Sequence, residues 1–137
     1  MTKILENIAH QRADFAYKCS EEASKKKYKK DYRAYIRRLP MQIKTNGLAQ
    51  TMAFFNSKSK EGNAYKKIYN ELHEWVRNKR EMFRQPEPDS HFIKALVNEE
   101  PASYRAITME VLSILEWWKR FVEALIEDDE GSQKDGL

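Results

Sequence analysis

The sequence has 137 residues, 41% hydrophobic and 34% charged, with 4 glycines, 4 prolines, 1 cysteine and a net charge of +4. These values suit one globular domain and exclude a fold of many tight turns, an intramolecular disulfide, a cysteine-rich zinc site and a membrane span. Residues 1–84 contain 20 Lys and Arg against 9 Asp and Glu, whereas residues 85–137 contain 5 against 12, which predicts a basic surface suited to a polyanion.

Helical periodicity dominates the first half of the sequence. Apolar residues at 3–4 spacing predict an amphipathic helix over Thr2–Ala23 and a second helix from about Tyr28. In the second helix, Pro40 must either begin a new helix or introduce a kink. Asn46-Gly47 predicts a break because both residues tolerate a positive φ, and a helical pattern then resumes over Leu48–Phe55. An exposed loop is expected up to residue 63.

Three more helices are expected in the second half. One runs from about Ala64 to Arg84, with Asn63 as its N-cap, and a short one spans about Ser90–Asn98. The last begins at Pro101 and ends near Glu127. The predicted fold class is therefore all-α, a compact irregular bundle of about five to seven helices that forms a single domain over residues 1–127. Residues 128–137 are predicted to be a disordered acidic tail, and the absence of a secretory leader predicts a cytoplasmic protein with no membrane partner.

No pattern in the sequence favours catalysis. Glu6, His10 and Asp14 share one helix face, but the Glu-x-x-His pairs of a di-iron bundle are absent, so a solvated helix face is the favoured interpretation. Cys19 lies on an apolar stripe about 13 Å along the helix from His10, which favours a core position over a nucleophile. His73 and His91 are left unassigned, so an enzyme is the weakest hypothesis. We predict no catalytic, cofactor-binding or metal-binding residues.

Basic residues are aligned on two of the predicted helices. At 100° per residue, one row lies opposite the apolar face of the second helix: Lys26, Lys30, Arg33, Arg37 and Lys44. A second row follows 4-3-4-3-4 spacing on the helix from Ala64: Lys66, Asn70, His73, Arg77, Arg80 and Arg84. Glu71, Glu74 and Glu81 fall outside that row. Such rows could follow a phosphate backbone, and an ordinary solvated face is the alternative.

Aromatic residues fall mainly on the apolar stripes. The tyrosines at 28, 32, 35, 65, 69 and 104 are therefore assigned to the core or to a subunit interface, although tyrosines can also stack on bases. Trp117 and Trp118 diverge by about 100°, so we expect one to be buried and the other to meet the rim or a partner.

Three blocks of sequence carry a family resemblance. They are Tyr35–Phe54 followed by Ser57-Lys58, Tyr65–Tyr69 through Trp75, and Tyr104–Ala106 with Leu115–Ala124. In this order they resemble the small helical subunit of the type III-B (Cmr) CRISPR RNA-silencing complex.

The resemblance implies a non-catalytic subunit of an antiviral ribonucleoprotein. Members of this family stack in several copies and help form the positively charged channel in which guide and target RNA pair. The implied partners are guide and target RNA, the other subunits of the complex and further copies of the chain. The alternative is a protein-only helical adaptor whose basic rows dock an acidic partner. Candidates for contacts to RNA phosphates are Lys30, Arg33, Arg37, Arg38, Lys44, Arg77, Arg80 and Arg84, of which Arg37, Arg38 and Lys44 lie inside the best-matching block.

Overall fold

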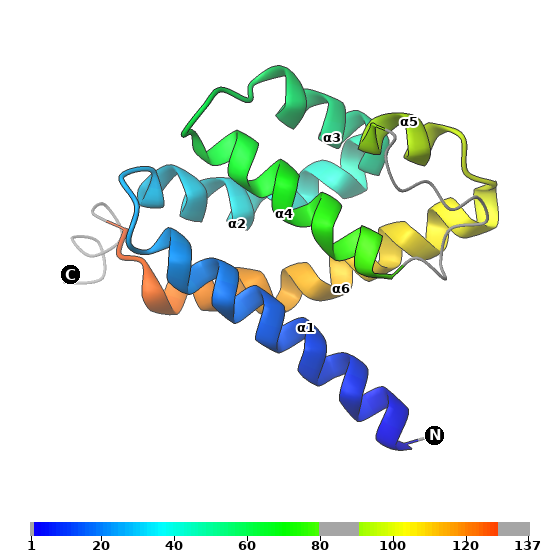
Figure 1. Ribbon diagram of the computed structural model, residues 1–137, viewed down its shortest axis with the longest axis horizontal. Coiled ribbons are helices and arrows are strands. Elements are labelled where there is room, and N and C mark those ends of the chain that lie inside the picture. Colours follow the sequence, from blue (N-terminus) through cyan, green and yellow to red (C-terminus); the bar gives the residue numbers. More distant parts are fainter. Residues whose placement is uncertain (1, 80–90, 129–137) are drawn as a thin grey trace.

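The computed structural model describes residues 2–79 and 91–128, with the backbone alone for residues 2–6. Within these ranges the chain forms six α-helices and no strand (Figure 1), which confirms the predicted all-α bundle. The predicted acidic tail lies outside the described residues except for Asp128. The helices are α1 (Thr2–Ala23), α2 (Lys29–Asn46), α3 (Leu48–Ser57), α4 (Ala64–Asn78), α5 (Phe92–Val97) and α6 (Pro101–Leu125).

The helices are arranged in three levels. α1 lies along α6, α2 and α4 lie above this pair in the view of Figure 1, α3 packs on α2 and α4, and α5 lies beside α3 at one end of the bundle. The core between these levels is built around large, fully buried side chains that include Trp118, Tyr32, Phe55 and Phe92. Trp117 is 40% exposed, so the predicted divergence of the two tryptophans is confirmed. Within the described ranges, every helix is too short or too polar to span a bilayer.

Local signals set the corner between α2 and α3. α2 continues through Pro40, so this proline does not begin a new helix. Gly47 then adopts φ +87° and ψ 158°, a conformation available mainly to glycine, and its N–H donates to the Ile43 carbonyl at 2.8 Å. The Ala49 N–H donates to the Tyr104 hydroxyl at 2.9 Å, which ties the first turn of α3 to α6. The predicted break at Asn46-Gly47 is therefore confirmed.

The two ends of α4 have different origins. Asn63 caps the start as predicted, since its Oδ1 accepts from the Lys66 N–H at 2.9 Å. The predicted extension of this helix to Arg84 is wrong, because α4 ends at Asn78. Lys79 leaves the helical region, at φ −108° and ψ 48°, while its Nζ donates to Gln11 of α1 at 2.6 Å and lies 4.6 Å from the Trp75 ring centroid. Among the described residues, the basic row predicted on this helix therefore ends at Arg77.

Candidate nucleic-acid interface

A buried polar cluster fixes α2 against α4 and α6. The Tyr32 hydroxyl donates to Glu71 Oε1 at 2.6 Å, and Trp118 Nε1 donates to that hydroxyl at 3.0 Å. Glu71 is only 5% exposed, and burial raises the pKa of its carboxyl to about 7. Because Tyr32 is held on the inner face of α2, the opposite face of this helix is directed to solvent. Sequence reasoning placed Glu71 outside the basic row and missed its burial.

A second buried carboxylate joins α1, α4 and α6. Arg12 donates from Nε and Nη2 to the two oxygens of Glu110 at 2.8 and 2.7 Å, and Trp75 Nε1 donates to Glu110 Oε2 at 3.1 Å. The hydrogen bond and the negative charge of Glu110 raise the pKa of Arg12. Arg12 is thus committed to the interior contact and is not available to a ligand.

The outer face of α2 carries the predicted basic row. Tyr32, Ile36, Leu39 and Ile43 are buried, whereas Lys30, Arg37, Arg38 and Lys44 are exposed. Lys30, Arg37 and Lys44 are spaced seven residues apart, close to two helical turns, so they lie along one side of α2.

Carboxylates from the end of α6 and the residues after it reach part of this row. Arg37 Nε donates to Glu123 Oε2 at 2.9 Å, and Arg33 Nη1 lies 3.3 Å from Asp128 Oδ2. The side chain of Arg33 is only 15% exposed. A phosphate would therefore compete with carboxylates of the same chain at Arg33 and Arg37, but at Lys44 no such pair occurs among the described residues.

The row on α4 is less continuous than predicted. Lys66 Nζ donates to Glu61 at 2.9 Å, and the His73 ring stacks on Phe92 with centroids 4.7 Å apart. Burial lowers the pKa of His73, so its ring is neutral at pH 7. Arg77 is exposed. Arg80 and Arg84 lie outside the described residues.

Arg38 begins an aromatic ridge on the other side of α2. Its guanidinium lies 5.4 Å from the Tyr35 ring centroid, and Tyr35 stacks on Tyr65 at 4.1 Å. Tyr65 meets the edge of Phe54, which is 42% exposed and has Lys58 Nζ 5.8 Å from its centroid. The prediction that six tyrosines belong to the core or to an interface is confirmed for the core, since each is buried or packs against it. They are Tyr28, Tyr32, Tyr35, Tyr65, Tyr69 and Tyr104.

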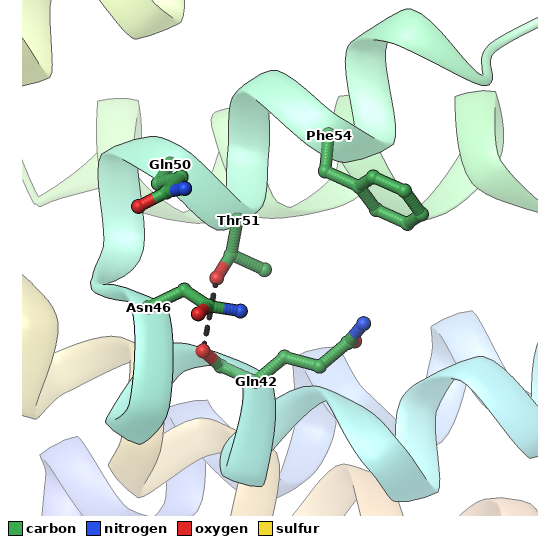
Figure 2. Close-up of a pocket in the computed structure, with 5 residues that line it drawn as sticks. All are labelled: Gln42, Asn46, Gln50, Thr51 and Phe54. Atoms are coloured by element: carbon green, nitrogen blue, oxygen red, sulfur yellow. Dashed lines mark hydrogen bonds between the residues drawn. The ribbon is translucent and has the colours of Figure 1, made fainter.

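A polar hollow lies in the corner between α2 and α3. Its lining residues are Gln42, Asn46, Gln50, Thr51 and Phe54, and its volume is about 210 Å³. Figure 2 shows that Gln42 and Asn46 come from α2 and Phe54 from α3, with the Gln42 side chain extending beneath the Phe54 ring. The single hydroxyl hydrogen of Thr51 is directed to the Gly47 carbonyl, at 2.7 Å from Oγ1, and the Gln42 carbonyl lies 3.2 Å from the same oxygen, which links α2 to α3 at the corner. Sequence reasoning missed this hollow, although all five residues lie in the best-matching block.

The groups considered for other chemistry occupy structural or solvated positions. Cys19 is buried, as predicted, and burial raises the pKa of its thiol. His10 is exposed, and Asp14 pairs with Lys18 at 3.1 Å. The Glu6 side chain lies outside the described part, and among the side chains of residues 7–79 and 91–128 no group of three His, Cys, Asp or Glu could hold a metal ion.

Comparisons with known proteins match most of the chain. The family model described as "CRISPR-associated protein (Cas_Cmr5)" matches residues 8–125. A protein named "CRISPR system Cmr subunit Cmr5" from Thermus thermophilus is 35% identical over 118 residues, which cover 85% of this chain and 93% of that protein. The crystal structure of a CRISPR-associated Cmr5 family protein from the same organism superposes with a TM-score of 0.70 at 34% identity, over 88% of this chain and 97% of that one.

Proposed function

Because the chain belongs to the Cmr5 family of CRISPR-associated proteins and is thus a small subunit of a type III-B (Cmr) complex, we propose that it binds RNA phosphates without catalysing a reaction. Its role is to present a basic surface along which guide and target RNA lie, beside further copies of itself and the other Cmr subunits.

The observation that carries this proposal is the outer row of α2. Lys30, Arg37 and Lys44 lie exposed along one side of a helix whose other side is fixed by buried side chains. Contacts between these cations and RNA phosphates do not involve the bases. This row therefore supports RNA binding that depends on the salt concentration and not on the RNA sequence. Arg77 on α4 is the remaining described candidate outside α2.

The ion pairs of Arg33 and Arg37 shape the expected affinity. RNA bound across α2 replaces the Glu123 carboxylate on Arg37 with a phosphate. The free energy gained from the phosphate contact is therefore reduced by the free energy lost with the Arg37–Glu123 ion pair. An exposed pair of this kind is worth about 0.2–1 kcal/mol. We therefore expect weak binding by one copy, strengthened when several copies meet the same RNA.

The proposal is tested by titrating the full chain into fluorescein-labelled single-stranded RNA at several salt concentrations, with anisotropy as the readout. Each phosphate contact on a single strand contributes about −0.7 to the slope of log K against log salt. Lys44→Glu should weaken binding and make the slope shallower by about 0.7 or more. Glu123→Gln should strengthen binding up to about fivefold, because it frees Arg37 from its internal partner.

Lys94→Glu provides the matched control, because Lys94 is an exposed lysine of α5 outside both basic rows. It makes the same change in net charge and should reduce affinity less than Lys44→Glu does. Affinity that ignores salt, or equal losses in Lys44→Glu and Lys94→Glu, would contradict a placed phosphate surface.

A protein-only adaptor is the second candidate function. The pairs Arg33–Asp128 and Arg37–Glu123 favour it, since they show that carboxylates fit the α2 row. The discriminating variants are Lys44→Glu and Arg77→Glu, assayed for co-purification with the other Cmr subunits. Loss of assembly while RNA affinity stays normal supports the adaptor, and loss of RNA with assembly intact supports the RNA surface.

A further inference from the structure

The hollow between α2 and α3 contains polar groups that the fold leaves unused. In the part of the chain that the structure describes, the side-chain amides of Gln42, Asn46 and Gln50 form no hydrogen bond with another residue. Each amide offers a donor and an acceptor in one plane. The Thr51 hydroxyl, by contrast, is already hydrogen-bonded to the Gly47 carbonyl at the corner. The site therefore combines a rigid frame with free, planar hydrogen-bonding groups.

The size of the hollow limits what it accepts. Its volume of about 210 Å³ is below the roughly 300–1,000 Å³ typical of pockets that enclose a whole small molecule. The hollow suits one flat group inserted from a larger ligand that stays outside. Phe54 supplies an apolar ring at the wall, and Gln42 extends beneath that ring from the opposite helix (Figure 2). A flat ring system can stack on the first and hydrogen-bond to the second.

Basic residues lie near the corner on α2 and just after α3. Arg38 is one helical turn before Gln42 on α2, and Lys58 follows one turn after Phe54, with its Nζ 5.8 Å from the Phe54 ring centroid. Both side chains are exposed. Lys58 is therefore placed to meet an anionic group attached to a flat group at Phe54, and Arg38, whose guanidinium rests on Tyr35, can meet a second one by changing its side-chain conformation.

We propose that this hollow accepts one unpaired nucleobase of the bound RNA, with adenine the best match. The base stacks on Phe54, its hydrogen-bonding edge meets the amides, and its flanking phosphates meet Arg38 and Lys58. Asn and Gln pair in two-point fashion with the N6 and N7 positions of adenine, and aromatic stacking is the usual way that proteins hold an unstacked base. A protein segment could also meet the amides, and the test below includes that outcome. This inference rests on the proposed RNA-binding function and adds a subsite to it.

The test compares two RNA duplexes that carry the same phosphates. One has a single bulged adenosine, and the other has an abasic ribose at that position, so the electrostatic contribution is equal. The full chain should bind the first duplex at least about fivefold more tightly, the lower end of what stacking one base on an aromatic ring contributes. A 2-aminopurine at the bulge should change its fluorescence on binding.

Phe54→Ala and Gln42→Ala should each remove most of this preference while leaving the salt slope unchanged. Both side chains are at least partly exposed, and an unchanged far-ultraviolet circular dichroism spectrum verifies folding. Met41→Ala is the matched control, because Met41 is 67% exposed beside Gln42 and does not line the hollow. It should keep the preference.

The outcomes separate the two proposals. If both duplexes bind equally but with a normal salt slope, the base site is wrong and the phosphate surface stands. If neither duplex binds at low salt, both proposals fail. If Phe54→Ala releases the chain from the other Cmr subunits while the preference for the bulge persists, the hollow is a protein contact and the base site is again wrong.

Discussion

Glu71→Gln isolates the energetic effect of a carboxyl group buried between α2 and α4. In the folded chain burial raises the pKa of Glu71 to about 7, whereas an unfolded chain returns it to about 4.3. The folded state thus holds the proton more tightly. The stabilisation from this proton is complete below about pH 4, and it is lost as the pH rises through 7. Since one pKa unit corresponds to about 1.4 kcal/mol, the loss amounts to about 3 kcal/mol.

Glutamine keeps an oxygen for the Tyr32 hydroxyl, which donates to Glu71 Oε1, but it cannot ionise. The free energy of unfolding of Glu71→Gln, relative to the wild type, should therefore rise by about 3 kcal/mol between pH 4 and pH 8. Urea titrations followed by tryptophan fluorescence measure this difference, because Trp118 lies in the same cluster. Comparing the two proteins cancels other titrating groups, including His73, whose lowered pKa acts in the opposite direction. Parallel pH profiles for the two proteins would refute the reasoning.

Three further substitutions test the contacts that hold the bundle together, each by thermal and urea denaturation. Arg12→Leu should lower the free energy of unfolding by about 3 kcal/mol, because it leaves the buried Glu110 carboxylate without its cation; a neutral result would show that Trp75 alone satisfies Glu110. Gly47→Ala should cost about 1–3 kcal/mol through backbone strain at φ +87°, and an unchanged stability would mean that the corner relaxes. Tyr104→Phe should cost about 1 kcal/mol, since the Ala49 N–H loses its acceptor; a loss confined to α3 in hydrogen exchange would identify this bond as the cause.

Helix positions were predictable where the deciding signal is local. Gly47, Asn63 and Pro101 each act through their own backbone or a bond to a residue three or four positions away, and all three were placed correctly. The end of α4 at Asn78 was not predicted, and the side chain of the next residue, Lys79, bonds to Gln11, 68 residues earlier in the chain. A contact of this kind leaves no trace in periodicity.

The burial of Glu71 and Glu110 could have been predicted from their positions along the helices, but sequence reasoning grouped charged residues by their charge alone. Glu71 lies three residues after Ile68 and four before Trp75, and Glu110 lies three after Ile107. Both therefore project on the apolar faces of their helices. An acid at such a position is buried only with a partner, so the pattern calls for a donor from another helix. The identity of the donors, Tyr32 and Arg12, required the tertiary structure.

The division of charge along the sequence has a consequence within the folded chain. Two acids from the acidic part, Glu123 and Asp128, pair within one molecule with Arg37 and Arg33 of the basic part. Such ion pairs weaken with salt in the same way as phosphate contacts do. Raising the salt concentration therefore weakens the competing Arg37–Glu123 pair as well as the contact between Arg37 and RNA. The net salt slope at Arg37 should then be smaller than that at Lys44, where no described carboxylate competes. Under the proposed function, such a surface favours RNA that engages many copies at once over a short strand on one copy, because the cost of displacing each carboxylate is small and the number of contacts decides the affinity.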